Sequence, residues 1–293
     1  MGSWATMVSD TQQMARQTPP QDGRADFGTQ PAGDTDTAGV PVLSSRTGDW
    51  VDRTASRMPR LHPALAFVMT LATGFAALAL TAIAAGLLVT ELLLDSGAIR
   101  SADESTVTWI VDQRGAAATD VSYIGSSLGG GLVLPVLAAL GALVFALRRQ
   151  WLASAFMALT LALESSVYRA TTLVIERQRP DVKRLEDLPA DASFPSGHTA
   201  ASVAVYAGLA LLITSRWTDG RLRAGVWASA IVLVLFVAMS RIYRGMHHPI
   251  DTLAGAAIGV GAIAVLVLAC RFAGAASRRR AVSHDRAEPL SLR

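Results

Sequence analysis

Three short polar clusters between residues 177 and 251 carry side chains that could perform phosphate chemistry. They span residues 177–180, 195–198 and 240–251, and together they hold several arginines, three of the five histidines and a carboxylate. Apolar segments long enough to cross a bilayer adjoin them. Because ionisable side chains at the ends of membrane helices are costly to place, they are usually functional. We therefore interpret the clusters as one site that binds and cleaves a phosphate ester.

The third cluster pairs a histidine with a carboxylate at the start of a predicted helix. Pro249 suits the first turn of a helix, so the last apolar span should begin near His248. His247 and Asp251 are then four residues apart, close enough for the carboxylate to accept a hydrogen bond from one imidazole nitrogen. A histidine held in this way is a nucleophile or base of fixed tautomer. The alternative is that Asp251 merely favours a helix N-terminus and that His247 is an interfacial side chain.

Arg241 and the second cluster could bind the phosphate itself. Arg241 lies at the outer end of the fifth apolar span, where it either snorkels to the headgroups or holds a phosphate with its bidentate fork. Ser196 is a good N-cap for the fourth span, and Gly197 lets the backbone approach a ligand. The free amides of such a helix start form an anion site, and His198 in the first turn could protonate a departing alkoxide. Taken alone, this cluster is also compatible with a capped helix that carries a chance histidine.

The composition indicates a membrane protein. Of the 293 residues, 51% are hydrophobic, and the mean hydropathy is +0.37. The apolar residues fall in runs and not in amphipathic stripes, which is typical of a membrane bundle. A single cysteine, Cys270, excludes an intramolecular disulfide and a cysteine zinc site. The basic residues are arginines except for Lys183, a bias typical of GC-rich bacterial genomes, and we assign their charge to membrane topology and phosphate binding.

The expected fold is an all-α bundle of six transmembrane helices with a disordered N-terminal tail. Residues 1–60 lack an apolar period and predict that tail. No signal-peptide pattern opens the chain, so the first span should act as an uncleaved anchor. Residues 95–130 predict an amphipathic surface helix, because apolar residues recur there at helical spacing among charged ones. The six expected spans are 64–94, 132–147, 151–175, 199–213, 226–239 and 250–272.

Basic loops determine the expected topology. An even number of spans places both termini on one side of the membrane. The positive-inside rule assigns basic loops to the cytoplasm, and the arginine groups all fall on that side: 53–60, 148–149, 216–223 and 278–280. The same count places the three polar clusters on the outer face. We predict a multi-pass protein of the plasma membrane, with a six-span domain at 61–273, cytoplasmic tails at 1–60 and 274–293, and an extracytoplasmic site.

Together, the clusters resemble the signatures of the type 2 phosphatidic acid phosphatase (PAP2) superfamily, which includes lipid phosphate phosphatases, undecaprenyl pyrophosphate phosphatases and soluble vanadium haloperoxidases. The order is Arg-Pro, then Pro-Ser-Gly-His, then Ser-Arg-x5-His-x3-Asp, and the likeness covers about residues 60–272. The resemblance implies a phosphohistidine mechanism without metal or cofactor. In it, Asp251 orients the nucleophile His247, and His198 transfers the proton. The implied phosphate-binding groups are Arg179, Ser196, Gly197 and Arg241.

One position departs from the family pattern. The first signature of the family is Lys-x6-Arg-Pro, and Thr172 stands where the lysine is expected. Arg169, one helical turn earlier on the same face, or Arg177, nearer the loop, could replace the missing charge. Guanidinium and ammonium groups are nevertheless not interchangeable. We assign Thr172 no catalytic role and interpret His248 as a helix-cap neighbour.

The resemblance implies an integral membrane phosphatase that acts on a lipid phosphate or pyrophosphate, either of the phosphatidate type or a polyprenyl pyrophosphate. Two alternatives stay open: a lipid phosphotransferase that uses the same site, and a noncatalytic membrane protein that binds lipid. Six apolar spans argue against a haloperoxidase. The expected partners are the membrane and the lipid substrate, with no nucleic acid, and the oligomeric state is not predicted. Glu164 and Tyr168, four apart in the third span, should make a buried polar contact and not touch the substrate.

Overall fold

The chain is helical throughout the part that the structure describes. The computed structural model describes residues 40–58, 61–190 and 192–287, which contain helices, turns and one isolated bridge, and no strand. The longer helices are α2 (Pro63–Leu87), α3 (Gly97–Asp112), α4 (Ala116–Leu128), α5 (Val133–Leu147), α6 (Trp151–Thr172), α9 (Gly220–Tyr243) and α10 (Pro249–Ala287). The shorter ones are η1 (Pro41–Leu43), α1 (Trp50–Ser56), η2 (Leu88–Leu93), α7 (Gly197–Ser202), η3 (Val203–Ala207) and α8 (Gly208–Thr214). The predicted all-α fold class is confirmed.

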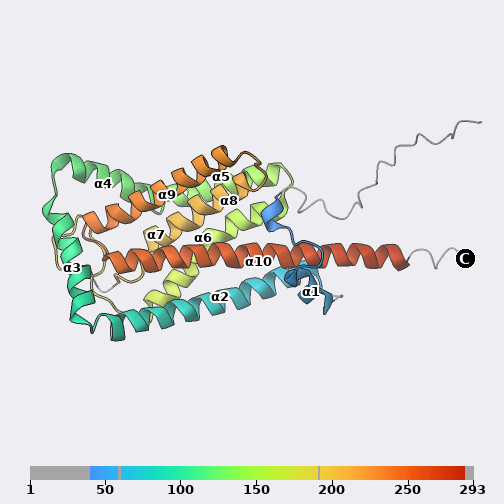
Figure 1. Ribbon diagram of the computed structural model, residues 1–293, viewed down its shortest axis with the longest axis horizontal. Coiled ribbons are helices and arrows are strands. Elements are labelled where there is room, and N and C mark those ends of the chain that lie inside the picture. Colours follow the sequence, from blue (N-terminus) through green and yellow to red (C-terminus); the bar gives the residue numbers. More distant parts are fainter. Residues whose placement is uncertain (1–39, 59–60, 191, 288–293) are drawn as a thin grey trace, which may run out of the picture. The chain divides into compact units, whose positions relative to one another are not determined.

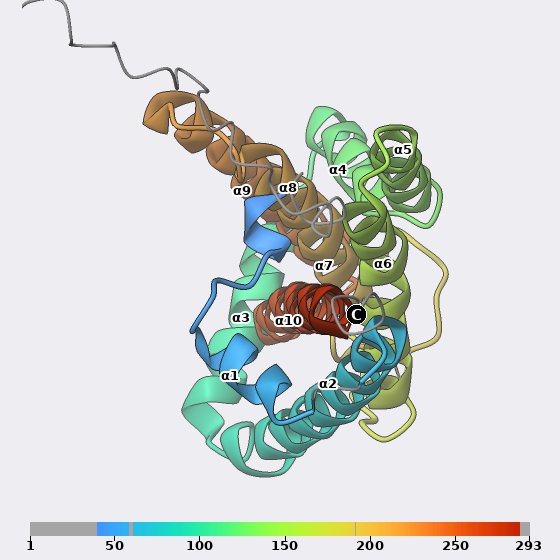
Figure 2. The same ribbon diagram turned by 90° about the vertical axis from the view of Figure 1, so that its right-hand side faces the viewer.

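Helix α10 is the element around which other helices pack. Helices α2, α6 and α7 contact it, and Figure 2 shows them around it. The close approach to α7 depends on two glycines of α10. A Cβ at Gly255 would overlap the carbonyl oxygen of Ser196, and a Cβ at Gly259 would overlap that of Ala200. Small residues at such positions let two membrane helices approach backbone to backbone.

Within the described residues, five helical segments are long and apolar enough to cross a membrane: 63–93, 151–172, 197–214, 220–243 and 249–282. A sixth span is present if α4 and α5 are counted as one, since these helices meet at a bend of 41°. Helix α5 alone has 15 residues, which is about 22 Å of helix and less than the roughly 30 Å of a hydrocarbon core. The predicted second span, 132–147, is therefore too short to cross by itself. The molecule is a multi-pass membrane protein.

Residues 95–130 form two helices and not the single surface helix that the sequence predicted. Helix α4 packs against α9 and leads through three glycines, 129–131, into α5. A Cβ at Gly129 would overlap the side chain of Val237 on α9. The break between α4 and α5 is therefore packed against a neighbouring helix.

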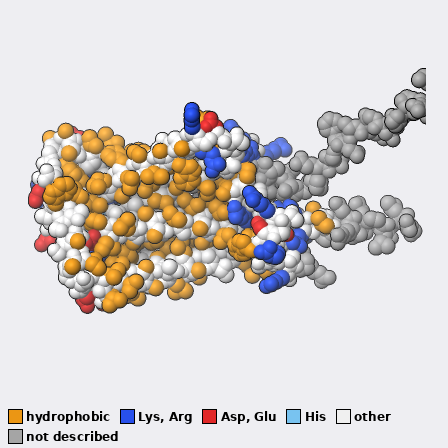
Figure 3. All heavy atoms as spheres, viewed as in Figure 1, with side chains coloured by type: hydrophobic (Ala, Val, Ile, Leu, Met, Phe, Trp, Pro, Cys, Tyr) orange, Lys and Arg blue, Asp and Glu red, His pale blue; other side chains and the backbone are white. Residues whose placement is uncertain are grey.

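Apolar side chains cover the sides of the helix bundle, and charged side chains gather at its ends (Figure 3). Leu80, Leu140, Val232 and Leu235 are each more than half exposed. An apolar surface of this extent is expected in contact with lipid. Figure 3 shows Lys and Arg at the end where α1 and the C-terminal part of α10 lie (Figure 1), and Asp and Glu at the opposite end.

The N-terminal segment is more structured than the sequence predicted, where the structure describes it. The predicted tail at 1–60 includes η1 and α1, and α1 buries Val51 and Ala55 against α10. The Trp50 ring meets the Phe272 ring edge to face, with centroids 5.7 Å apart. The prediction for residues 1–39 lies outside the described residues. Helical structure is therefore present before the first span begins.

The segment predicted as a basic C-terminal tail is helical over most of its length. Helix α10 has 39 residues, about 58 Å at the usual rise, so it extends well past a hydrocarbon core. It continues as far as Ala287, and most of the predicted tail at 274–293 is therefore helix. Arg271 and Arg278 of α10 donate to the Val42 carbonyl and the Ser45 hydroxyl. These contacts give the basic end of α10 a packing role besides its charge.

Candidate active site

Two connecting segments bring the three predicted clusters together at the end of the bundle away from α1 (Figure 1). The α6–α7 connection carries the first two clusters, and the α9–α10 turn carries the third. The amide of Ser196 donates to the Asp251 carbonyl at 2.9 Å, which joins the second cluster to the third. The amide of Ser193, two residues before the second cluster, donates to the Arg177 carbonyl at 3.0 Å and so links that cluster to the first. Residues far apart in the sequence therefore share one site.

His247 is buried, with one ring nitrogen held by the backbone. It is 3% exposed, and its Nδ1 lies 2.7 Å from the carbonyl oxygen of Ser193. Because a carbonyl only accepts, Nδ1 carries the proton and Nε2 presents its lone pair. Nη1 of Arg179 lies 3.4 Å from that Nε2. Burial lowers the pKa of His247 to about 3, against the opposing charge of Asp251, so the imidazole is neutral.

Asp251 supports His247 through Ser193 and not by the direct hydrogen bond that the sequence predicted. Its Oδ2 lies 3.9 Å from Nδ1 of His247, which is too far for a hydrogen bond. The same oxygen accepts from the Ser193 hydroxyl at 2.6 Å and from the His248 amide at 2.8 Å. The predicted hydrogen bond between Asp251 and His247 is therefore absent, because these two closer donors occupy Oδ2 of the carboxylate. His248 does occupy the helix-start position expected of it.

Asp251 belongs to a buried chain of ion pairs. Arg177 bridges Asp251 and Asp103 of α3, and its Nη2 lies 2.5 Å from Oδ2 of Asp103. The other oxygen of Asp103 accepts the amide of Ile250 at 3.1 Å. All three charged residues are less than 10% exposed. Because removing one partner of a buried ion pair leaves an uncompensated charge, this chain should hold the start of α10 firmly to α3.

A cavity of about 350 Å³ opens beside His247. The predicted site residues in its wall are Arg179, Gly197, His198, Arg241 and His247. The imidazole of His198 makes no hydrogen bond to any described residue, so it can face a ligand. The remaining wall is largely apolar, with Leu134, Leu161 and Ala201 among its residues. This combination of cationic, imidazole and apolar surfaces suits a phosphate that carries an apolar chain.

Arg241 is fully buried and forms an ion pair with Glu186, which is not one of the predicted site residues. Its Nη1 lies 2.7 and 2.8 Å from the two carboxylate oxygens of Glu186 and 2.5 Å from the Ser126 hydroxyl. Nε of Arg244 binds the same carboxylate at 2.6 Å. Burial raises the pKa of Glu186, but the hydrogen bonds and charges of Arg241 and Arg244 outweigh it and lower that pKa to about 2. Nε and Nη2 of Arg241 are buried and have no hydrogen-bond partner among the described residues.

Ser196 and Gly197 occupy different environments. Ser196 is the N-cap residue of α7, as predicted, but its side chain makes no capping bond to the helix backbone. Its hydroxyl lies instead 3.0 Å from the hydroxyl of Thr199, and the residue is not part of the cavity wall. Gly197 does line the cavity, and a Cβ there would lie 3.0 Å from the ring of Tyr168. The lack of a side chain at 197 therefore permits Tyr168 to pack over the helix start.

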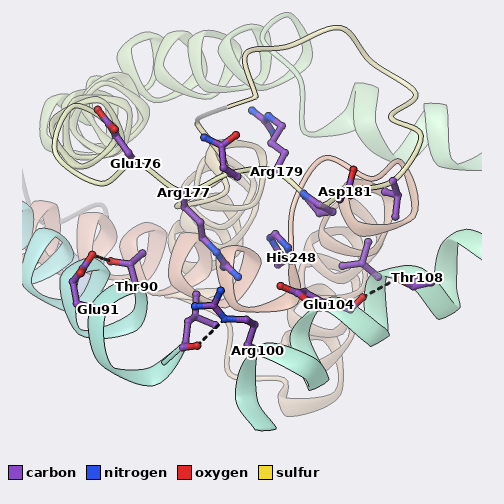
Figure 4. A pocket seen from close by; sticks show the side chains of 15 residues that line it. Thr90, Glu91, Arg100, Glu104, Thr108, Glu176, Arg177, Arg179, Asp181 and His248 are labelled. Atoms are coloured by element: carbon purple, nitrogen blue, oxygen red, sulfur yellow. Dashed lines mark hydrogen bonds between the residues drawn. The ribbon is translucent and has the colours of Figure 1, made fainter. Parts of the chain in front are cut away.

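Neither predicted substitute for the missing lysine lies in the wall of this cavity. Arg169 is exposed, and the Thr172 hydroxyl donates to the Arg169 carbonyl at 3.0 Å. Arg177 is held by two carboxylates and lines a neighbouring cavity of about 670 Å³. Figure 4 shows that neighbouring cavity, with Arg177 extending towards α3. Among the residues predicted to bind phosphate, only Arg179 borders both cavities. Arg179 and Arg241 both line the cavity beside His247, and they supply its guanidinium charge.

Sequence reasoning missed three residues that support the site: Asp103, Glu186 and Ser193. Asp103 looked like one of several acids on an amphipathic helix, and only its contacts distinguish it. Glu186 lies between the first and second clusters, and its partners Arg241 and Arg244 are more than 50 residues further along the chain. Ser193 acts partly through its backbone carbonyl, for which the side-chain sequence gives no signal.

Known proteins with similar sequences and folds show the family of this chain. The model of the PAP2 superfamily matches residues 151–274. A decaprenylphosphoryl-5-phosphoribose phosphatase of Mycobacterium tuberculosis is 35% identical over 164 residues, which are 53% of this chain and 81% of that protein. Phosphatidylglycerophosphatase B of Bacillus subtilis is 28% identical over 178 residues, 59% of this chain and 85% of that protein.

A solved structure extends the agreement to the fold. The crystal structure of a transmembrane PAP2-type phosphatidylglycerolphosphate phosphatase from Bacillus subtilis matches with a TM-score of 0.54 and 26% identity, over 68% of this chain and 92% of that one. Fold, site and relatives together define an integral membrane phosphatase built of helices. The chain belongs to the PAP2 superfamily, as its three clusters predicted.

Proposed function

We propose that this protein hydrolyses a lipid phosphate ester with His247 as the nucleophile. The observation that carries the proposal is the placement of its two ring nitrogens. Nδ1 is engaged by the Ser193 carbonyl at 2.7 Å, whereas Nε2 lies beside the cavity at 3.4 Å from Nη1 of Arg179. A neutral imidazole of fixed tautomer, next to a cation that attracts phosphate, is well suited to attack phosphorus.

The proposed reaction has two steps. First, Nε2 of His247 bonds to phosphorus while the bond from phosphorus to the lipid oxygen breaks, and a protonated His198 gives its proton to that oxygen. Then water attacks the phosphohistidine and gives a proton to His198, and the bond from nitrogen to phosphorus breaks with its electron pair returning to Nε2. The products are a lipid alcohol and inorganic phosphate. Both histidines end in the state in which they started.

Two guanidiniums stabilise the transferred phosphoryl group in this proposal. Phosphoryl transfer depends mainly on positioning and on stabilising charge at the equatorial oxygens. Arg179 borders the cavity beside Nε2, and Arg241 offers two buried donors without a partner among the described residues. These groups allow a reaction without a metal ion, which a chelator tests directly.

The proposed substrate and membrane orientation rest on the position of the cavity. The cavity lies at the end of the bundle away from the basic segments. By the positive-inside rule we propose that both termini are cytoplasmic and that the site faces outward from the plasma membrane. Its apolar wall can hold the part of a lipid nearest the headgroup. The names of the relatives from Mycobacterium tuberculosis and Bacillus subtilis support a phosphorylated lipid as the substrate.

Phosphate release by purified protein in detergent tests the proposal. The wild type should release phosphate from phosphatidate or a polyprenyl pyrophosphate in the presence of EDTA, and His247→Ala should abolish release while the protein stays folded. Labelled substrate should leave an acid-labile, base-stable label on the wild type. Label that passes to an added lipid or sugar alcohol would identify a phosphotransferase. Absence of release from every lipid phosphate, or full activity of His247→Ala, would reject the proposal.

A further inference from the structure

The cavity contains one buried acid that the proposed reaction does not use. Glu164 of α6 lies in the cavity wall and is 1% exposed. Its Oε2 accepts the Ser165 hydroxyl at 3.1 Å, whereas Oε1 has no hydrogen-bond partner among the described residues. A buried polar atom without a partner is costly, and an ionisable residue within a membrane span is a functional-site hypothesis by default. The predicted polar contact between Glu164 and Tyr168 is not formed.

The position of Glu164 relative to the phosphate site can be followed along α6. Tyr168 packs over Gly197 at the start of α7, next to His198. Glu164 precedes Tyr168 by four residues, so it lies about 6 Å further along the helix, towards the middle of the membrane. Leu161 continues the same wall in that direction. A substrate whose phosphate lies at His247 therefore presents the first atoms of its leaving alcohol to Glu164 and its apolar chain to the leucine.

We infer that Glu164 is a specificity residue that binds a free hydroxyl on the leaving alcohol, close to the phosphate ester. This inference rests on the proposed function and narrows its substrate class. A hydroxyl is both donor and acceptor, so it can pair with Oε1 whether the carboxyl is ionised or neutral. A glycerol or sugar phosphate within a lipid carries such a hydroxyl. A plain polyprenyl phosphate places hydrocarbon against Glu164 and leaves the acid without a partner.

The preference should have a measurable size. A site that holds a polar group in place for a substrate hydroxyl rejects the analogue that lacks it, because its own group is then left unpaired. One neutral hydrogen bond is worth about 1 kcal/mol, and 1.4 kcal/mol is a tenfold change in rate. The expected preference for the hydroxyl-bearing substrate is therefore about fivefold in kcat/KM.

Two substrates that differ in one hydroxyl test the inference. Lysophosphatidate carries a hydroxyl on the carbon next to the phosphorylated carbon, and its 2-deoxy analogue lacks only that group. The wild type should hydrolyse lysophosphatidate about fivefold faster by kcat/KM. Glu164→Leu should reduce the ratio to about one, and Glu164→Gln, which keeps an oxygen acceptor and adds an amide donor, should retain most of it. A purely structural role would change the two rates equally.

Ser166→Leu is the matched control. Ser166 lies on the same helix, is exposed, and donates its hydroxyl to the Ala162 carbonyl at 2.7 Å. This variant should keep the wild-type ratio. Equal rates for the two substrates with the wild type, or an unchanged ratio in Glu164→Leu, would overturn the inference alone. Failure of the wild type to hydrolyse either lipid, or any other lipid phosphate, would overturn the proposed function together with it.

Discussion

Ser193 connects Asp251 to His247 although the two side chains do not bond to each other. Its carbonyl oxygen lies 2.7 Å from Nδ1 of His247, and its hydroxyl donates to Asp251 at 2.6 Å. The carboxylate itself stays 3.9 Å from Nδ1. The tautomer of His247 is therefore set by backbone, and the carboxylate positions that backbone.

Replacing the Ser193 hydroxyl should cost less than replacing the carboxylate. Ser193→Ala keeps the carbonyl that fixes the tautomer, so kcat should fall by less than about tenfold, the worth of one hydrogen bond. Asp251→Asn removes the negative charge that pairs with Arg177. We therefore expect kcat to fall by at least about 100-fold, which is comparable with the loss of general acid–base catalysis. Steady-state phosphate release measures both. Equal losses in the two variants would contradict a backbone-held tautomer.

Asp103 should matter to activity although it lies on α3, far from the sequence clusters. Asp103→Ala leaves Arg177 with one carboxylate and removes an acceptor from the Ile250 amide, so stability should fall by about 3 kcal/mol, as for a broken buried ion pair. kcat should fall more than KM changes, because the start of α10 is displaced while Arg179 stays. Denaturant unfolding in detergent and phosphate release measure the two effects.

Removing an exposed acid from the same helix separates the effect of the buried ion pair from a general effect of changing α3. Asp112→Ala, on the same helix but exposed, should change neither stability nor kcat appreciably. Similar effects of both substitutions would show that α3 contributes only as a packed helix.

Glu186 should make stability sensitive to acid. Its pKa is lowered from 4.5 to about 2 in the folded protein, so its stabilising contribution is complete above about pH 4.5 and is lost as the pH falls towards 2. Glu186→Gln should lower the unfolding temperature at pH 6 and flatten its pH dependence between about 4.5 and 2. Thermal unfolding over that range measures both. An acid dependence identical to that of the wild type would refute the role of the Arg241 and Arg244 ion pairs.

His198 should matter most when the leaving group is a poor one. A lipid alkoxide needs a proton as it departs, so His198→Ala should reduce hydrolysis of a lipid phosphate by about 100- to 10,000-fold. A nitrophenyl phosphate leaves without that proton, and its formation of phosphoenzyme should be much less affected. Single-turnover labelling of the protein with each substrate measures this step. An equal loss with both substrates would assign His198 to phosphate binding and not to proton transfer.

The sequence by itself determined the class of fold and most of the residues of the site. Apolar runs can only be satisfied as helices in lipid, and arginines and histidines at their ends mark a place where charge is needed. That logic predicted an all-α membrane bundle and selected Arg179, His198, Arg241 and His247, which share one cavity. It also located the helix that begins after His248.

Only the tertiary structure decided which side chains touch. The i,i+4 spacing brings Asp251 near His247, but two closer donors occupy the carboxylate: the Ser193 hydroxyl of the α6–α7 connection and the amide of the neighbouring His248. The partnerships of Arg177 with Asp103 and of Arg241 with Glu186 join segments more than 50 residues apart. Such contacts depend on how helices pack and on backbone groups that every residue shares, so no local pattern of side chains could reveal them.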